Sequence, residues 1–556
     1  MGEEHAFHLS LVTHRWQLVK RDKRRVDLSV EPNLILTGFM GTGKTTVGQL
    51  IAQRLGREFI DTDQWIEERA GKSVAAIFAE DGEDRFRAWE TEACAALSKP
   101  QGLIIATGGW ALEPQKNREA MQRGGCVICL WAEPEAILAR LQGVDDRPML
   151  GSDDRGTKLR ALLKQREDVY RSFAWQVDTT KLDVVEVLLQ VMALYGSVST
   201  LNDPDTFYLP MGERGNAVML GAGLLEAIGP VLRARGLRGT VALIGDSNVI
   251  EQHGDCVYQS LLLSGFEVVP LRVPAGEESK TLDMAGMLYE QLVQGGLERS
   301  GVIVALGGGV IGDLSGFVAA TYLRGVPWIN CATSLLAMVD ASSGGKTGVD
   351  LPSGKNLVGA FHPPLLTISD LTVLRTLPER EFQGGMAEVI KAGIIGDVEL
   401  FKMIEAGSTD IHEIIRRSIK VKVDVVREDP FEKGRRAALN FGHTIGHGIE
   451  AASQFLLRHG EAIGIGMIAE AKIAEWMGLA RPGLSERIKM VTELVGLPTR
   501  FANLETDTIL QLMRSDKKKQ LGRLRFALPR DIGDVVNDVD VKDELVRKAV
   551  DAVREE

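Results

Sequence analysis

The sequence predicts an α/β protein made of three units: a parallel sheet covered by helices at the N-terminal end, a second α/β unit, and an all-helical unit at the C-terminal end. Short apolar runs alternate with helical patterns over residues 33–196, and the alternation restarts at about residue 208. Beyond about residue 371, strand signals become scarce and helical periodicity dominates. The length of 556 residues agrees with several units, because a single hydrophobic core rarely grows past about 250–300 residues.

The expected elements follow this order. In the first unit we expect strands at 34–37, 102–106 and 126–130 and helices at 45–55 and 84–97. Further on we expect strands at 241–244 and 302–306 and helices at 384–395, 410–427 and 459–477. A polar stretch with Ser, Thr, Asn, Asp and Pro separates the units. The predicted division is an N-terminal extension at 1–32, a domain at 33–196, a linker at 197–207, and two further parts at 208–371 and 372–556.

Composition narrows the range of partners. The net charge of −11 argues against broad binding to nucleic acid or anionic membranes. The sequence shows no apolar stretch of membrane-spanning length and no secretory signal, and its five cysteines suggest a reducing compartment. We therefore expect a cytoplasmic protein. Cys126 and Cys129 form a CxxC motif, but they lie in a run typical of a buried strand, so we expect no metal or redox role for them.

A phosphate-binding loop opens the first unit. The run GFMGTGKT at 38–45 matches GxxxxGK[ST], follows a predicted strand and precedes a predicted helix. Its backbone N–H groups and the helix N-terminus favour phosphate, Lys44 reaches the terminal phosphates, and the Thr45 hydroxyl can hold Mg²⁺. The predicted ATP contacts are Gly41, Thr42, Gly43, Lys44, Thr45 and Thr46.

Two carboxylates follow the next predicted strand. Asp61 and Asp63 either cap a helix at the surface or serve the site, with Asp61 near the metal and Asp63 on a substrate hydroxyl as acceptor and base. The residues alone favour neither interpretation.

These residues belong to a series of segments that resembles shikimate kinases over about 33–190. The segments are GFMGTGKT at 38–45, DTD at 61–63, IFAEDGE at 77–83 with Phe86, Arg87 and Glu90, ATGG at 106–109, RPML at 147–150 and REDVY at 166–170. The resemblance implies that Asp63, Arg87, Gly109 and Arg166 hold shikimate and that Arg147 belongs to a lid over ATP. Two guanidinium groups suit a substrate carboxylate. The chain departs from the family at Trp110, where a third glycine is usual.

The second unit contains a glycine turn, GGGVIGD at 307–313, between a strand and a helix. It differs from the GxGxxG fingerprint but offers the same close backbone approach to a pyrophosphate, so it predicts a Rossmann-like nucleotide site.

Histidines concentrate in the C-terminal part. Six of the nine lie there, and His443 and His447 share a helix face at i,i+4 spacing. With the carboxylate of Glu388, two imidazoles would form a three-ligand metal site with a position open for substrate. His447 and His459 compete as the last ligand, and histidines without metal are the alternative.

Basic and amide side chains crowd the same half, several of them in glycine-rich loops, which predicts pockets for a phosphate and a carboxylate. They are Arg324, Lys346, Lys355, Asn356, Lys391, Lys422, Arg436, Asn440, Lys517 and Lys518.

This half resembles 3-dehydroquinate synthases over about 208–550. The segments are GEESK at 276–280, GGGVIGDL at 307–314, AMVDASSGGKTG at 337–348, GKNLVGAFH at 354–362, MAEVIK at 386–391, LNFGHTIGH at 439–447 and HGE at 459–461. The resemblance implies Zn²⁺ or Co²⁺ on Glu388, His443 and His459, with His447 as a substrate contact. It implies a homodimer, with Arg324 reaching across the interface.

The resemblance also assigns the remaining roles. The implied NAD contacts are Asp246, Asn248, Glu277, Lys280, Gly308, Gly309, Asp313, Thr333, Ser334, Lys346 and Lys355. The implied substrate contacts are Lys346, Lys355, Asn356, Lys391, Lys422, Arg436, Asn440 and one of Lys517 or Lys518. Catalytic roles fall to Lys44 and Asp63 in the first unit and to Lys346, Lys391, Arg436, Asn440 and His447 in the second.

The resulting expectation is a bifunctional enzyme of the shikimate pathway. One half would phosphorylate shikimate with ATP and Mg²⁺. The other would convert 3-deoxy-D-arabino-heptulosonate 7-phosphate to 3-dehydroquinate and phosphate, with NAD regenerated. One alternative is a P-loop kinase fused to an NAD-dependent polyol dehydrogenase or another sugar-phosphate cyclase. Another is a fusion in which one half is a structural or regulatory remnant.

Overall fold

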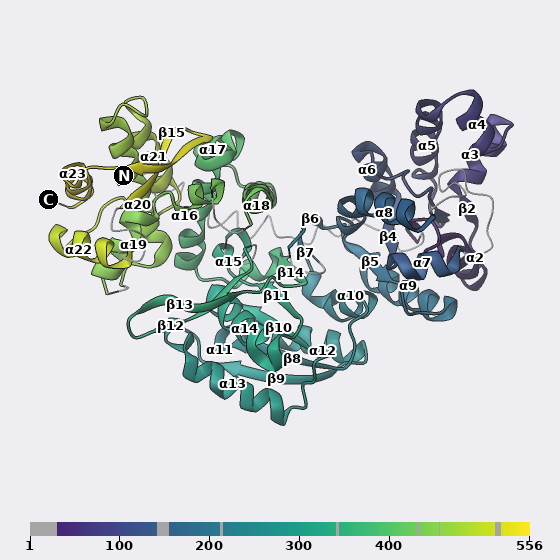
Figure 1. The fold of residues 1–556 in the computed structure, drawn as a ribbon, viewed down its shortest axis with the longest axis horizontal. Coiled ribbons are helices and arrows are strands. Elements are labelled where there is room, and N and C mark those ends of the chain that lie inside the picture. Colours follow the sequence, from purple (N-terminus) through teal and green to yellow (C-terminus); the bar gives the residue numbers. More distant parts are fainter. Residues whose placement is uncertain are drawn as a thin grey trace.

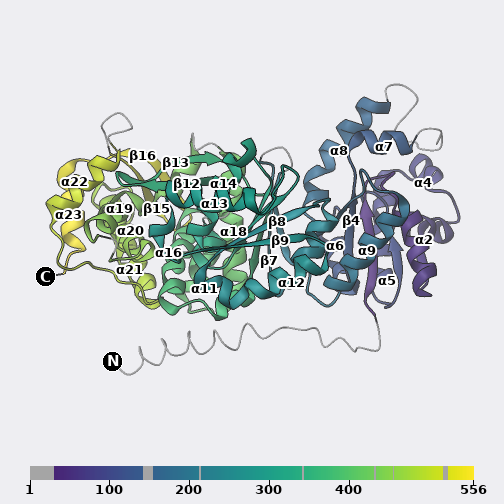
Figure 2. The same ribbon diagram turned by 90° about the horizontal axis from the view of Figure 1, so that it is seen from below.

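The structure, a computed structural model, describes residues 31–141, 155–211, 215–340, 344–430, 434–454, 456–517 and 524–555. Most of the predicted extension, together with Arg147 and Lys518, lies outside these residues. The chain forms an α/β unit at one end, a larger α/β unit in the middle and a mostly helical unit at the other end (Figures 1 and 2). The predicted α/β class, with two α/β units followed by a mostly helical one, is thereby confirmed.

The N-terminal unit is a five-stranded sheet with strand order β2-β3-β1-β4-β5, in which every neighbouring pair is parallel. Its strands are β1 (Asn33–Gly38), β2 (Phe59–Asp61), β3 (Ile104–Ala106), β4 (Gly125–Trp131) and β5 (Trp175–Asp178). Its helices are α2 (Lys44–Leu55), α3 (Thr62–Ala70), α4 (Val74–Glu80), α5 (Glu83–Leu97), α6 (Gln115–Gly124), α7 (Pro134–Arg140), α8 (Arg155–Arg171) and α9 (Val184–Val198). Strands β1 and β4 are buried along their whole length, because helices cover both faces of the sheet.

The cysteine pair shows these two faces. Cys126 packs with the core on the α2 and α9 side, whereas Cys129 packs with the core on the α5 and α8 side. Their side chains therefore point to opposite faces of β4 and cannot share a metal or form a disulfide.

The middle unit is a seven-stranded sheet with strand order β6-β7-β14-β11-β10-β8-β9. Its strands are β6 (Asp205–Leu209), β7 (Asn216–Gly221), β8 (Thr240–Asp246), β9 (Glu267–Val273), β10 (Val302–Gly307), β11 (Trp328–Ala332) and β14 (Leu366–Asp370). Only β6 runs antiparallel to its neighbour among these strands. Its helices are α10 (Ile228–Ala234), α11 (Ser247–Val249), α12 (Asp255–Leu263), α13 (Leu282–Gln294), α14 (Gly309–Thr321) and α15 (Leu335–Val339).

A hairpin of β12 (Lys346–Leu351) and β13 (Gly354–Phe361) lies above this sheet and reaches toward the helical unit (Figure 1). The helices of that unit are α16 (Glu379–Gly396), α17 (Val398–Glu405), α18 (Ile411–Glu428), α19 (His443–Ala452), α20 (His459–Trp476), α21 (Leu484–Leu494), α22 (Thr506–Lys517) and α23 (Asp543–Ala552).

The C-terminal unit departs from the prediction in one respect. It is not all-helical, because β15 (Arg525–Asp531) and β16 (Asp534–Asp540) form an antiparallel hairpin. The turn contains Gly533 at φ 91°, a left-handed conformation that glycine adopts without strain. None of the helices in the described residues is long and apolar enough to cross a membrane.

The two α/β units touch directly. Helix α9 packs against α10, and one continuous apolar core runs from Leu34 through Val191 to Leu232. The indole of Trp175 donates a hydrogen bond to Asp203 at 2.8 Å. The segment expected as a linker, 197–207, contains the end of α9 and the beginning of β6.

Candidate active sites

The phosphate-binding loop lies where β1 gives way to α2. Gly43, at φ 96°, precedes the helix, and the Lys44 ammonium donates to the carbonyls of Gly38 and Phe39 at 2.8 and 3.0 Å. The Thr45 hydroxyl donates to Asp61 Oδ2 at 2.9 Å. The predicted Mg²⁺ pair, Thr45 and Asp61, is therefore in direct contact at the carboxyl edge of the sheet, where parallel strands place ligand sites.

The predicted shikimate contacts lie beside this loop, around the turn after β3. A Cβ atom on Gly108 would lie 2.8 Å from Asp63 Oδ1 and 3.0 Å from Glu90 Oε1, so the turn passes these carboxylates too closely for a side chain. Arg87 pairs with Glu90 at 2.8 Å, and burial nevertheless raises the pKa of Glu90. A Cβ on Gly109 would lie 3.8 Å from Arg166 Nη1. The structure thus brings the four predicted shikimate contacts close to the turn after β3.

The ring of Trp110 lies against Arg166. The guanidinium carbon of Arg166 lies 4.5 Å from the centre of the Trp110 ring and 5.7 Å from that of Phe39. Arg166 is 6% exposed, and the Tyr170 hydroxyl on the next turn of α8 donates to the carbonyl of Gly109. The residue that replaces a glycine of the family therefore packs on the predicted carboxylate-binding arginine.

The predicted NAD contacts meet at the carboxyl edge of the seven-stranded sheet. Asp246 ends β8 and accepts hydrogen bonds from the backbone of Asn248 and Val249 at 2.9 and 3.1 Å. Gly308 follows β10, and a Cβ there would come within 3.3 Å of Ser334 Oγ, which follows β11. A small pocket at this point is lined by residues that include Gly308, Gly309, Asp313 and Lys346. Thr333, which lies in the sequence between the end of β11 and Ser334, is buried.

Lys280 connects this edge to the hairpin. Its ammonium donates to Asp313 Oδ2 at 2.7 Å and to Asn356 Oδ1 at 2.6 Å, and it lies 3.8 Å from Glu277 Oε1. Lys355, next to Asn356, lies 3.9 Å from the same oxygen of Glu277. Predicted NAD and substrate contacts thus form one polar cluster.

Three imidazoles and one carboxylate form the centre of the helical unit. The ring centre of His443 lies 5.1 Å from that of His447 and 5.3 Å from that of His459, and one nitrogen of each ring lies within 4.8 Å of the others. Glu388 Oε1 lies 3.7 Å from His443 Nε2 and 3.5 Å from His459 Nε2. Both competitors for the last ligand position, His447 and His459, are therefore present.

This cluster fits a divalent cation. Glu388 is 2% exposed and forms an ion pair with Lys391, and its Oε1 faces the imidazoles of His443 and His459. Burial alone would raise the pKa of Glu388, but the charge of Lys391 holds it well below the usual range. Burial lowers the pKa of His443 well below its ordinary value, so this ring is neutral. A neutral imidazole beside a carboxylate suits Zn²⁺ or Co²⁺.

Positive charges surround the cluster. Lys422 lies 2.5 Å and Lys391 4.0 Å from Asp340 Oδ1. Burial alone would raise the pKa of Asp340, but these two charges lower it to about 2. Arg436 is buried and donates to the carbonyls of Pro430 and Gly344.

For the other predicted contacts, the structure gives the element on which each residue lies. Asn440 ends the same turn as Arg436, Arg435–Asn440, next to α19. Arg324 is exposed, with φ 69°, after α14. Lys517 ends α22, and its side chain lies outside the described set.

The sequence interpretation missed two carboxylates beside the cluster. Glu470 accepts hydrogen bonds from the backbone of Gly442 and Ile445 at 2.7 and 3.0 Å, and so fixes the N-terminus of α19. Glu450 contacts His459 and Lys355. Its spacing of seven residues from His443, on the same helix face, was the available signal.

Comparison with known proteins agrees with the families that both halves resemble. Family models match as shikimate kinase at 40–194, 3-dehydroquinate synthase N-terminal at 270–384, and 3-dehydroquinate synthase C-terminal at 385–519. The 3-dehydroquinate synthase of Symbiobacterium thermophilum is 44% identical over 358 residues, 62% of this chain and 100% of that protein.

Two solved structures are similar to the same part. The 2-epi-5-epi-valiolone synthase ValA of Streptomyces hygroscopicus subsp. jinggangensis, with NAD⁺ and Zn²⁺ bound, is 28% identical with a TM-score of 0.57, covering 62% of this chain and 98% of that one. A 2-deoxy-scyllo-inosose synthase complexed with carbaglucose-6-phosphate, NAD⁺ and Co²⁺ is 28% identical with a TM-score of 0.56, covering 62% and 99%. Since the relative from Symbiobacterium is matched over its full length, and the kinase match runs from the phosphate loop to α9, the chain belongs to the 3-dehydroquinate synthase family and carries a shikimate kinase domain ahead of it.

Proposed function

We propose that the chain is a bifunctional enzyme of aromatic biosynthesis in which each half works with the residues gathered above. The N-terminal half phosphorylates shikimate with ATP and Mg²⁺. The C-terminal half converts 3-deoxy-D-arabino-heptulosonate 7-phosphate to 3-dehydroquinate and phosphate, using NAD and Zn²⁺ or Co²⁺. The observation that carries the second assignment is the buried Glu388 among three imidazoles, with Lys391 and Lys422 beside it.

In the kinase half, Lys44 neutralises the transferred phosphate, and Thr45 with Asp61 holds Mg²⁺. Gly41, Thr42, Gly43 and Thr46 line the ATP phosphates, and Arg147 closes over ATP. Asp63 accepts the proton of the attacking hydroxyl. Arg87 and Arg166 bind the shikimate carboxylate beside Gly109.

In the synthase half, Glu388, His443 and His459 are the metal ligands, and His447 contacts the substrate. When bound, NAD supplies reversible hydride acceptance and the metal ion supplies polarisation of a substrate hydroxyl. The protein binds the phosphate and carboxylate of the substrate through its basic and amide groups: Lys346, Lys355, Asn356, Lys391, Lys422, Arg436, Asn440 and one of Lys517 or Lys518. Their charges also keep phosphate in the site as it leaves.

Along the carboxyl edge of the seven-stranded sheet, NAD would be held by Asp246, Asn248, Glu277, Lys280, Gly308, Gly309, Asp313, Thr333, Ser334, Lys346 and Lys355. The bound NAD⁺ and metal ions of the two similar synthases support these assignments.

We also propose the domain division stated above and a homodimer formed through the synthase half, with Arg324 at its interface. We place the enzyme in the cytoplasm, where ATP, NAD and phosphorylated sugar acids are available.

Two substitutions in the full chain test these assignments against each other. Lys44→Ala should abolish ADP formation that depends on shikimate and leave phosphate release from the heptulosonate phosphate unchanged. His443→Ala should do the reverse and should also lower the content of bound Zn²⁺ or Co²⁺. Unchanged phosphate release by His443→Ala would refute the metal site, and unchanged ADP formation by Lys44→Ala would refute the ATP site.

A further inference from the structure

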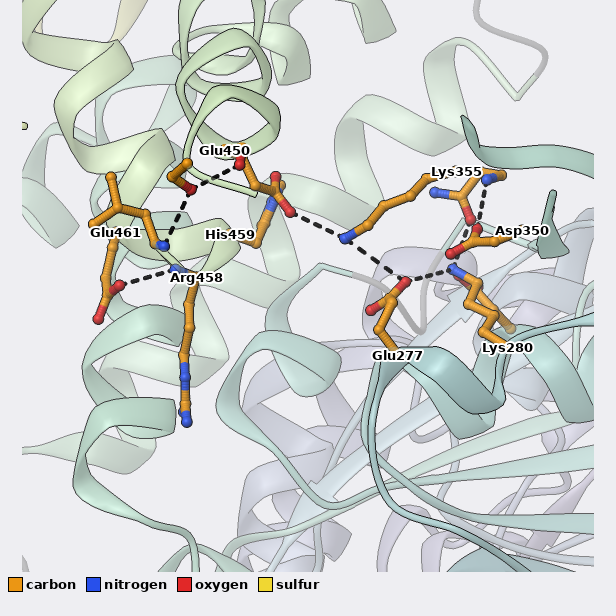
Figure 3. Close-up of polar contacts among 12 residues, drawn as sticks. Glu277, Lys280, Asp350, Lys355, Glu450, Arg458, His459 and Glu461 are labelled. Carbon is orange, nitrogen blue, oxygen red and sulfur yellow. Dashed lines mark hydrogen bonds and ion pairs between the residues drawn. The ribbon is translucent and has the colours of Figure 1, made fainter. Parts of the chain in front are cut away.

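Glu450 links the metal cluster to the hairpin of the nucleotide-binding unit. It lies on α19, one turn beyond His447, and is 6% exposed. Its Oε2 lies 3.2 Å from His459 Nδ1, and its Oε1 accepts a hydrogen bond from the Lys355 ammonium at 3.1 Å (Figure 3). One carboxylate therefore contacts a proposed metal ligand with one oxygen and a proposed cofactor contact with the other.

The contact with His459 determines which ring nitrogen faces the cluster. In the neutral ring, an Nδ1–H that donates to Glu450 leaves the lone pair on Nε2, the atom that lies 3.5 Å from Glu388 Oε1. His443 is held differently, because its Nδ1 lies 3.2 Å from the carbonyl of Phe441. Such outer partners fix the tautomer and ring orientation of metal ligands.

The contact with Lys355 extends the chain of charges to the nucleotide edge. Lys355 lies on β13, between Glu450 on α19 and Glu277 after β9, and its distance to Glu277 Oε1 is 3.9 Å (Figure 3). One carboxylate on α19 thus bridges a residue of α20 and a residue of β13.

We propose that Glu450 is a positioning residue with two roles. It orients His459 for metal binding, and through its contact with Lys355 it couples the metal site to the occupancy of the nucleotide site. The inference rests on the proposed metal and NAD sites. Its physical basis is that Lys355 cannot move toward a bound nucleotide without weakening its contact with Glu450. When this contact weakens, Lys355 neutralises less of the negative charge of Glu450, so Glu450 presents a stronger negative charge to His459.

The first test measures metal affinity in the full chain by competition with a chromophoric chelator. Glu450→Ala should bind Zn²⁺ and Co²⁺ about 10–100-fold more weakly than the unmodified chain, the usual loss when such a partner is removed, and Glu450→Gln should lie between them. Glu461→Gln is the matched control, because Glu461 is a buried carboxylate near His459 that pairs with Arg380 instead. It should bind metal normally.

The second test records the visible absorption of the Co²⁺-loaded chain before and after saturating NAD, with NAD binding measured separately by calorimetry. NAD should shift the Co²⁺ bands in the unmodified chain and in Glu461→Gln. The shift should be lost in Glu450→Gln even at saturating NAD, and the NAD affinity of this variant should rise because Lys355 no longer has to leave an ionised carboxylate.

The outcomes separate the inference from the function on which it rests. If His443→Ala keeps normal metal affinity, the proposed metal site is wrong and the role of Glu450 is overturned with it. If His443→Ala loses the metal while Glu450→Ala binds it normally, only the orienting role is overturned. A full NAD-induced shift in Glu450→Gln overturns the link through Lys355.

Discussion

The substitution Trp110→Gly tests how the kinase half holds its acceptor. This change restores the glycine that is usual in shikimate kinases and removes the ring 4.5 Å from the guanidinium carbon of Arg166. A large ring at this position can act in two opposite ways: it can hold the arginine in place, or it can occupy space that shikimate needs. The burial of Arg166 between Trp110 and Phe39 favours the first effect.

The size of the effect follows from this geometry. A cation–π contact is worth about 0.5–1 kcal/mol at an exposed site and about 2 kcal/mol when desolvated. Arg166 is only 6% exposed, so we take about 1–2 kcal/mol for its contact with Trp110. Because about 1.4 kcal/mol corresponds to a factor of ten, the KM for shikimate should rise about 5–30-fold.

Steady-state ADP formation at saturating ATP and varied shikimate measures this change. Trp110→Phe should keep most of the affinity, because a smaller ring remains. The KM for ATP should not change, and phosphate release by the synthase half of the same chain controls for folding. An unchanged KM for shikimate in Trp110→Gly would refute the holding role, and a lower KM would show that the ring obstructs the acceptor.

Three further predictions follow from the two halves. Removal of tightly bound metal by a chelator, followed by addition of Mg²⁺, should abolish phosphate release from the heptulosonate phosphate but not shikimate phosphorylation. Addition of Zn²⁺ or Co²⁺ should restore phosphate release. Equal loss of both activities would contradict separate metal sites. Glu470→Ala leaves the backbone donors of Gly442 and Ile445 without their partner. At about 1–3 kcal/mol per donor, the free energy of unfolding measured by urea titration should fall by about 2–6 kcal/mol. An unchanged midpoint of unfolding would exclude this capping role. Burial raises the pKa of Cys129 to about 12 and that of Cys256 to about 11. At pH 8 an aromatic disulfide reagent should therefore label the partly exposed Cys256 slowly and the buried Cys129 only after unfolding. Mass spectrometry identifies the labelled cysteine.

The sequence predicted what is local. The phosphate loop is recognisable because its glycines, Lys44 and Thr45 lie within eight residues between a strand and a helix, and the expected helix at 45–55 is observed as Lys44–Leu55. The glycine turn after β10 is recognisable for the same reason. The pair His443 and His447 needed only the helix period. In each case the chemistry is carried by one short segment whose conformation the segment itself specifies.

Features that depend on tertiary packing were not predicted. Glu470 lies on α20, and nothing in the sequence near it indicates that its carboxylate caps α19. Glu450 shares a helix face with His443, but its partners come from α20 and β13. The hairpin of β15 and β16 was missed because it is short and follows a long helical region. Trp110 was recognised as a departure, but only the structure shows that its ring packs on Arg166.

The junction between the halves shows why a fusion of two enzymes need not behave as two tethered parts. Helix α9 is the last helix of the kinase unit, and it packs both on α2 of its own unit and on α10 of the synthase. Its buried stripe, which includes Val187, Val191 and Val198, belongs to the apolar core that continues into α10. Only residues 199–204 separate α9 from β6, the edge strand of the synthase sheet. Separation of the two units at this segment would expose the part of α9 that faces α10, so the synthase unit stabilises the kinase unit by burying apolar surface of α9.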